Sequence, residues 1–170
     1  MPPPSDQHDR PVRPVRSALG SGAVGTAVHL VLDANWVAPS IARDRVESWL
    51  RAHRWPPAQV DELVLAVSEA VSNSVEHGYR VAPDVLESGE RVEVLVRIST
   101  ADDGYRLVEF AVADHGAWRE PVSTASTRGH GMLIMRSCTD ELTVDGTPEG
   151  TTVVLRSRPA PPQPAGPEPG

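Results

Sequence analysis

Hydrophobic and polar residues alternate along several segments of the chain, as they do in strands with one buried face. The first of these, TAVHLVLDA, is also rich in β-branched residues. Two others flank Asp102-Asp103-Gly104, a sequence that favours a tight turn, so they predict an antiparallel hairpin. The last two predict a second hairpin. The predicted strands cover residues 26–34, 91–100, 105–114, 141–146 and 150–157.

Three further segments predict helices. In IARDRVESWLRAHRW the apolar residues lie near one face, with Pro39-Ser40 as a start signal and Pro56-Pro57 as an end signal. The second predicted helix covers AQVDELVLAVSEAVSNSVEHG, and Gly78 is expected to be its C-cap. The third, GHGMLIMRSCTD, is short and begins with two glycines.

The order of these elements is β-α-α-β-β-α-β-β. It indicates an α+β fold, a two-layer sandwich in which a mainly antiparallel mixed sheet carries helices on one face. Too few βαβ units are present for a Rossmann fold. Both ends are rich in proline, so residues 1–24 and 158–170 are predicted to be disordered tails around one domain at 25–157. Residues 115–129 predict a mobile loop.

The composition narrows the classes of function. The chain has 170 residues, a net charge of −7 and a pI of about 5.3, so a general nucleic-acid surface is not expected. It contains no lysine, which excludes the lysine of a Walker motif. Cys138 is the single cysteine, so no intrachain disulfide can form. We expect its side chain to lie in the core. With no signal region and no membrane-spanning segment in the sequence, we expect a cytoplasmic protein.

A line of polar residues interrupts the second predicted helix. Glu69, Asn73 and His77 follow one another at steps of four and therefore share one side of the helix. One interpretation is a solvated polar face, which most helices have. The other is a cleft in which an amide oxygen binds Mg²⁺ and a carboxylate accepts a proton from an attacking hydroxyl.

Three other short stretches favour the second interpretation. VADHG ends a strand at Asp114, whose carboxylate can accept a hydrogen bond from an exocyclic amino group. RGHGM, at 128–132, opens a helix with two glycines and so predicts an anion site. EGTTVVL places Thr151 at the start of the last strand, where its hydroxyl can support Asp114. Each stretch alone is weak, but their order in one short chain is specific.

Taken together, these stretches resemble the GHKL superfamily of ATP-binding proteins, which share the Bergerat fold. SEAVSNSVEHGY resembles its N box, VADHG its first glycine box, RGHGMLIMRSCTDELTV its second glycine box with the following helix, and EGTTVVL its last strand. The likeness spans about residues 26–157. It is greatest to the anti-sigma factor serine/threonine kinases, which switch bacterial sigma factors.

The resemblance implies a role for each matching residue. Asn73 would hold the Mg²⁺ that bridges the ATP phosphates, and Glu69 would be the general base for a substrate hydroxyl. Asp114 would bind the adenine amino group with support from Thr151, and Gly116 would let the backbone pass close to the base. The residues implied to contact ATP are Asn73, His77, Asp114, Gly116, Arg128, Gly129, His130, Gly131, Met132 and Thr151.

Some of these assignments have alternatives. His77 is as well explained by a helix-end histidine bonded to backbone, and Arg128 by a solvated arginine in the loop that would close over the γ-phosphate. The sequence also departs from the family at Trp118, which stands where the second glycine of the first box, D-x-G-x-G, usually lies.

The implied function is an ATP-dependent serine/threonine kinase that acts as an anti-sigma factor. It would phosphorylate an anti-sigma factor antagonist and regulate a sigma factor by partner switching. The expected partners are the antagonist, the sigma factor and a second copy of the chain, with no direct nucleic acid and no membrane. The alternative is a nucleotide-dependent protein-binding module without kinase activity, which Glu69 argues against and Trp118 favours. An ATPase that drives conformational change would need output domains.

Overall fold

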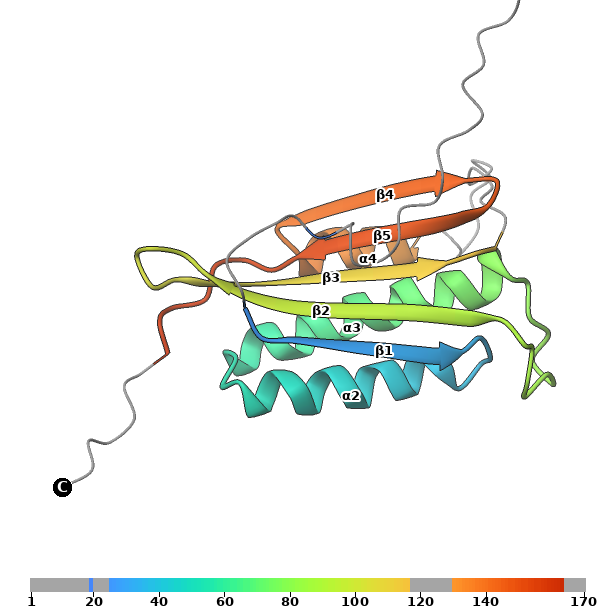
Figure 1. The fold of residues 1–170 in the computed structure, drawn as a ribbon, viewed down its shortest axis with the longest axis horizontal. Coiled ribbons are helices and arrows are strands. Elements are labelled where there is room, and N and C mark those ends of the chain that lie inside the picture. The colour runs from blue at the N-terminus through green and yellow to red at the C-terminus, as the bar shows by residue number, and fades with distance from the viewer. Residues whose placement is uncertain (1–18, 20–24, 117–129, 164–170) are drawn as a thin grey trace, which may run out of the picture.

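The computed structural model describes residues 19, 25–116 and 130–163, and in it one sheet carries the helices on one face (Figure 1). Arg128, Gly129 and Trp118 lie outside the described residues. The strands are β1 (Ala27–Asp33), β2 (Arg91–Thr100), β3 (Arg106–Asp114), β4 (Glu141–Thr147) and β5 (Gly150–Arg156). The helices are α2 (Ala38–Ala52), α3 (Pro57–Asn73), the π-helix η1 (Ser74–Gly78) and α4 (His130–Cys138).

The strands lie in the order β1-β2-β3-β5-β4, and each of the four pairings between them is antiparallel. The predicted element order, fold class and helix layer are therefore confirmed. The parallel component of the expected mixed sheet is not found among the described strands. Hairpins join β2 to β3 and β4 to β5, and α4 carries the chain over the helix face to the edge strand β4 (Figure 1).

The core lies between the sheet and the helices. Alternate residues of the central strands face it, among them Val94 of β2 and Phe110 of β3, both fully buried. Leu50 of α2 and Leu63 of α3 meet them from the helix layer. Because aromatic residues are scarce, small and β-branched side chains fill most of this space.

The second helix ends differently from the sequence prediction. α3 runs directly into the π-helix, and the first residue with positive φ beyond it is Arg80, at 55°. The expectation that Gly78 is the C-cap is therefore wrong. A methyl group on the Gly78 Cα would lie 3.0 Å from Asp114 Oδ1, so glycine is needed at this position for close packing rather than for a left-handed turn.

The C-terminal segment follows the domain beyond the predicted boundary at 157. Ala160 is fully buried and forms a backbone bridge with Arg106, with N–H···O distances of 2.8 and 2.9 Å in the two directions. The Arg106 guanidinium, 7% exposed, donates hydrogen bonds to the backbone carbonyls of His53, Arg54 and Pro161. The start of the Pro-rich segment is thus held to the domain by backbone hydrogen bonds. A prediction of disorder from composition cannot detect such pairing.

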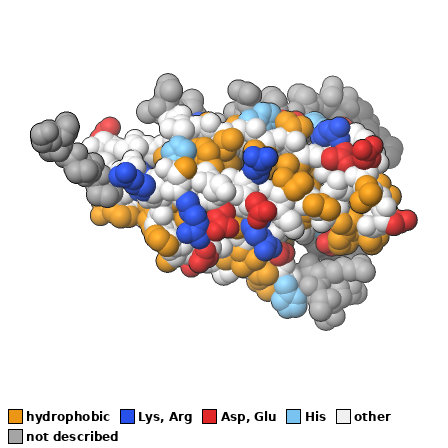
Figure 2. Space-filling model, turned by 90° about the horizontal axis from the view of Figure 1, so that it is seen from below, with side chains coloured by type: hydrophobic (Ala, Val, Ile, Leu, Met, Phe, Trp, Pro, Cys, Tyr) orange, Lys and Arg blue, Asp and Glu red, His pale blue; other side chains and the backbone are white. Residues whose placement is uncertain are grey.

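Charged side chains of both signs are interspersed on the edge that α2 and β1 form (Figure 2). Arg51 pairs with Glu47 one turn earlier on α2, at 2.8 Å. This described face offers no uniformly basic patch of the kind that attracts a nucleic-acid backbone. Among the described residues, no helix has the length and apolar character needed to cross a bilayer.

Candidate functional site

Glu69 and Asn73 lie against the start of α4. Both are half-buried on α3, one turn apart. A methyl group on the Gly131 Cα would lie 3.1 Å from Glu69 Oε2 and 3.5 Å from Asn73 Oδ1. The structure therefore brings Glu69 and Asn73 of one helix together with Gly131 near the start of another, nearly sixty residues later in the chain. A bare glycine backbone faces the carboxylate and the amide directly.

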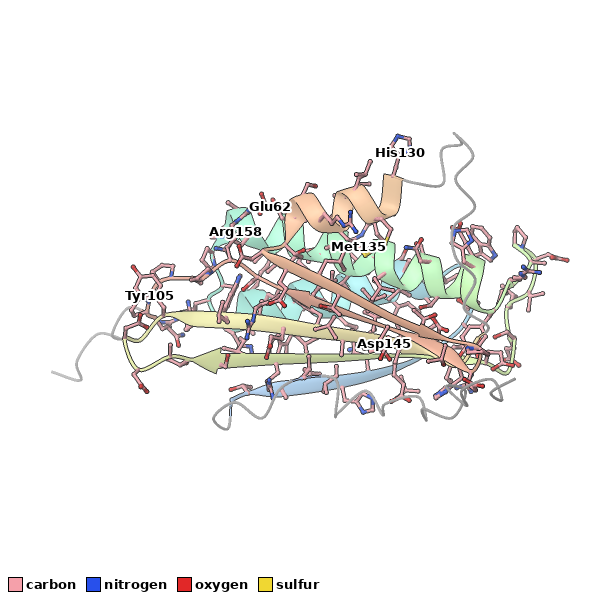
Figure 3. All side chains as sticks on the ribbon, turned by 90° about the horizontal axis from the view of Figure 1, so that it is seen from above. Glu62, Tyr105, His130, Met135, Asp145 and Arg158 are labelled. Carbon is pink, nitrogen blue, oxygen red and sulfur yellow. The ribbon has the colours of Figure 1, made fainter. Side chains whose placement is uncertain are left out.

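Three other residues predicted to contact ATP differ in their exposure. His77 is exposed in the π-helix. Met132 is half-buried and packs against the core cluster, so its side chain has a structural contact in addition to any use of its backbone. His130 is exposed at the first position of α4, and its side chain points away from the sheet (Figure 3).

Asp114 lies at the end of β3 and is 2% exposed. Its Oδ1 accepts a hydrogen bond of 3.0 Å from the Gly116 N–H, and the Ser74 side chain and the Thr151 backbone also hydrogen-bond to the carboxylate. Burial raises the pKa of Asp114 above its ordinary value, while these hydrogen bonds act in the opposite direction. The result is a carboxylate that is held firmly and shielded from water.

Three glycines let the backbone close around Asp114. A methyl group on Gly116 would lie 2.2 Å from the Gly78 carbonyl oxygen. One on Gly150 would lie 2.2 Å from the Asp114 carbonyl oxygen, and Gly150 has a φ of 155°. No side chain fits at either contact. The backbone therefore approaches the carboxylate from η1, from the turn after β3 and from the start of β5.

Thr151 lies opposite Asp114 in the sheet. The two residues are partners in the β3–β5 register, and Thr151 is 7% exposed. The Thr151 backbone hydrogen-bonds to the Asp114 carboxylate. Strand pairing thus places Thr151 next to Asp114, and the support expected from its hydroxyl stays a prediction from the sequence.

Two functional candidates were missed by sequence reasoning. Ser74 is 4% exposed and reaches Asp114 from the first residue of the π-helix. The Tyr79 hydroxyl accepts a hydrogen bond of 2.7 Å from the His115 N–H and donates one of 2.6 Å to the Arg91 carbonyl. Regular helix geometry gives no signal for these contacts, because the π-turn rotates the residues that follow it.

Two hollows in the described part of the chain lie away from this cluster. One of about 730 Å³ is lined by residues that include Asp33, Asn35 and Arg91 at the β1–β2 edge. The other, of about 420 Å³, lies beside Trp55 and Arg106. Among the described residues, no three His, Cys, Asp or Glu side chains lie close enough together to hold a metal ion by themselves.

Comparison with known proteins adds to this geometry. The family described as histidine kinase-like ATPase domain matches residues 33–157. The anti-sigma F factor of Bacillus velezensis is 30% identical over 135 residues, which cover 75% of this chain and 89% of that protein. The anti-sigma F factor of Bacillus subtilis is 29% identical over the same length and shares. A crystal structure of the RsbU and RsbW domains of a Mycobacterium tuberculosis protein is 26% identical with a TM-score of 0.55, covering 81% of this chain but 33% of that one.

Proposed function

The chain belongs to the histidine kinase-like ATPase domain family, and from that premise we propose that it is an ATP-dependent serine/threonine kinase that acts as an anti-sigma factor. The resemblance to the GHKL superfamily noted in the sequence is confirmed by this membership. The observation that carries the kinase proposal is the position of Glu69 and Asn73 against the bare backbone of Gly131.

The environment of Asp114 fits an adenine base. A carboxylate offers about four acceptor positions, and three are used by Gly116, Ser74 and Thr151. The remaining position can accept a hydrogen bond from the exocyclic amino group of adenine. Because Asp114 is almost wholly buried, such a bond would form in a low-dielectric environment, where it is stronger than in water.

The other end of the site fits phosphate and Mg²⁺. The first turn of a helix generally directs backbone N–H groups and the positive end of the helix dipole toward an anion, and Gly131 in the first turn of α4 leaves no side chain in the way. With no cluster of acidic or histidine ligands in the described residues, a magnesium ion here would take Asn73 Oδ1 and oxygens of the phosphates. His130, Gly131 and Met132 are the described residues that we assign to the phosphates, and Arg128 and Gly129 remain predictions from the sequence.

Glu69 is the residue that we assign to the chemistry. Bound Mg·ATP would supply the phosphoryl group and neutralise charge, and the chain supplies position and a proton acceptor. Glu69 would accept the proton of a substrate serine or threonine hydroxyl as that oxygen attacks. Its carboxylate lies one helical turn from Asn73 and next to Gly131, so it is placed beside the proposed phosphate site. His77 is exposed in η1, and its assignment to phosphate contact remains a prediction from the sequence.

The relatives guide the choice of protein partners. Two are named anti-sigma F factors, and the chain spans 89% of each. We therefore propose a sigma factor as the bound target and an anti-sigma factor antagonist as the phosphorylated substrate. Regulation would follow by partner switching, with the chain as a homodimer. Because a sigma factor acts on RNA polymerase, the proposed site of action is the cytoplasm.

A labelled-phosphate assay tests the proposal. The purified chain, Mg²⁺, labelled ATP and a candidate antagonist are combined, and wild type is compared with Glu69→Gln. We expect transfer to the antagonist to fall about 10²- to 10⁴-fold in the variant, while ATP binding persists. Glu76→Gln is the matched control, because Glu76 is exposed in η1. Label on the antagonist that is equal in wild type and Glu69→Gln would contradict the assignment.

The same assay separates the alternative function. A nucleotide-dependent protein-binding module would bind ATP and its partner protein but transfer no label in wild type. The observation that favours this alternative is Trp118, which replaces a glycine of the first glycine box in the sequence. ATP binding without transfer to any tested antagonist would support the module and reject the kinase.

A further inference from the structure

Tyr79 forms a link between two strands at the adenine end of the proposed site. Its hydroxyl donates a hydrogen bond to the Arg91 carbonyl at the start of β2 and accepts one from the His115 N–H just after β3. We propose that Tyr79 is a positioning residue that sets the selectivity of the site for adenine by holding the Asp114–Gly116 turn in place. This inference rests on the proposed function, because it concerns the base that Asp114 reads.

The register of the sheet shows what the hydroxyl replaces. The β2–β3 pairing ends with Val92 opposite Asp114, so the next position would place Arg91 opposite His115. There the tyrosine hydroxyl lies between the carbonyl of one strand and the N–H of the other. The two strands are therefore linked through Tyr79 at this position instead of by a direct backbone bond. The end of β3 is free to turn away, and Asp114 is the last residue before that turn.

The π-helix places the hydroxyl at this point. The Tyr79 N–H donates to the Ser74 carbonyl at 2.9 Å, an i to i+5 bond that closes the wide turn. Ser74, at the other end of the same turn, hydrogen-bonds to the Asp114 carboxylate. This single turn of backbone thus contacts residues 114–116 twice. Ser74 contacts the Asp114 carboxylate, and Tyr79 contacts the N–H of the next residue, His115. Gly78 between them packs against both Asp114 and Gly116.

The hydroxyl must be protonated to form both bonds. A phenolate could still accept the His115 N–H, but it could not donate to the Arg91 carbonyl. Burial raises the pKa of Tyr79, and the negative charges of Asp114 and Glu90 raise it further. The neutral form therefore persists at physiological pH, and the link does not depend on titration there.

Removing the hydroxyl should loosen the turn and leave the ring packing unchanged. In Tyr79→Phe the Arg91 carbonyl and the His115 N–H must either meet each other, which shifts Asp114, or turn to water. One hydrogen bond contributes about 0.5–1.5 kcal/mol, so we expect ATP binding to weaken about 3- to 10-fold. Inosine triphosphate has a carbonyl oxygen where adenine has an amino group, so it lacks the exocyclic N–H donor that Asp114 would bind. Its binding should change about twofold or less, and the preference for ATP should fall.

The experiment is calorimetry of ATP and inosine triphosphate, each with Mg²⁺, on wild type, Tyr79→Phe and Tyr105→Phe. Tyr105 is the matched control: it is the other tyrosine of the chain and precedes β3 at the opposite end from Asp114 (Figure 3). We also expect faster amide hydrogen exchange at His115 in Tyr79→Phe.

The outcomes are distinguishable. A selectivity ratio that is unchanged in Tyr79→Phe overturns the inference and leaves the proposed function standing. An equal loss of selectivity in Tyr105→Phe also overturns it, because the effect would then not depend on the link at His115. A wild type that binds neither nucleotide overturns the proposed function, and this inference with it.

Discussion

The substitution Asp114→Asn separates the charge of this side chain from its shape. The variant retains the size of the side chain but replaces one acceptor oxygen with an NH₂ donor. In the wild type the carboxylate accepts hydrogen bonds from Gly116, Ser74 and Thr151 and keeps an acceptor position for the base. Because 2% of Asp114 is exposed, water cannot readily compensate for a mismatched donor.

The expected change in binding follows from the charge on the acceptor. A hydrogen bond to a charged group contributes about 1.5–3 kcal/mol, so its loss should weaken ATP binding about 10- to 150-fold. Inosine triphosphate presents a carbonyl oxygen at the same ring position, which the new NH₂ group can bind. The variant should therefore prefer inosine triphosphate over ATP, and competition calorimetry with both nucleotides measures the reversal.

The pH dependence of stability gives an independent check on the same residue. Because burial raises the pKa of Asp114 above its ordinary value of 3.8, the folded chain binds this proton more tightly than the unfolded chain does. The stability that this group contributes is therefore present at low pH and is lost as the pH rises through the folded pKa. Wild type should gain melting temperature relative to Asp114→Asn as the pH is lowered from neutral toward the ordinary value of 3.8.

The comparison of the two proteins cancels the groups that they share, so the difference in melting temperature reports on Asp114 alone. A difference that stays constant, or that moves in the opposite direction on acidification, would refute the argument from burial. An Asp114→Asn protein that still prefers ATP would refute the assignment of this carboxylate to the base.

Two further changes test other parts of the molecule. Gly131→Ala adds a methyl group 3.1 Å from Glu69 Oε2, so labelled-phosphate transfer should fall. The free energy of unfolding should stay the same or rise by about 0.5–1 kcal/mol, because alanine has the higher helix propensity. Equal transfer rates would show that Glu69 does not need its present position. Arg106→Met removes a buried guanidinium from three carbonyl oxygens and should lower the free energy of unfolding in urea by about 2–4 kcal/mol. Arg158→Met, at an exposed ion pair with Glu62, should lower it by about 1 kcal/mol or less, and an equal loss in both would contradict the role of burial.

The sequence predicted the fold because the strands and helices each follow a single periodicity. Strand β2 was predicted at its observed bounds, and the turn at Asp102-Asp103-Gly104 contains a glycine with a φ of 83°. The alternation of apolar residues was enough, since each strand buries one face. The sequence could also predict that Asp114 and Thr151 lie side by side, because that contact depends on strand pairing.

The contacts that the sequence did not predict depend on irregular backbone. The π-helix shifts the residues after Asn73, so no helical projection places Ser74 against Asp114 or Tyr79 between β2 and β3. Gly78 was interpreted through local conformation, whereas the glycine is explained by its close packing against the Asp114 side chain, a contact distant in sequence. Such contacts follow from packing between segments, which a single sequence does not encode as a local pattern.

The arrangement of α3 and η1 implies that the two ends of the proposed site can be separated by mutation. Glu69 and Asn73 belong to the part of this continuous helix that meets α4, whereas Ser74 and Gly78 belong to the π-turn that meets Asp114. A change at Asp114 should therefore weaken ATP binding but leave the transfer rate at saturating ATP nearly intact. Glu69→Gln should lower that rate and spare ATP affinity, because the amide keeps the size of the side chain but does not accept the proton. If both variants change both quantities to the same degree, the helix does not divide the site, and the separate roles assigned to its two segments are wrong.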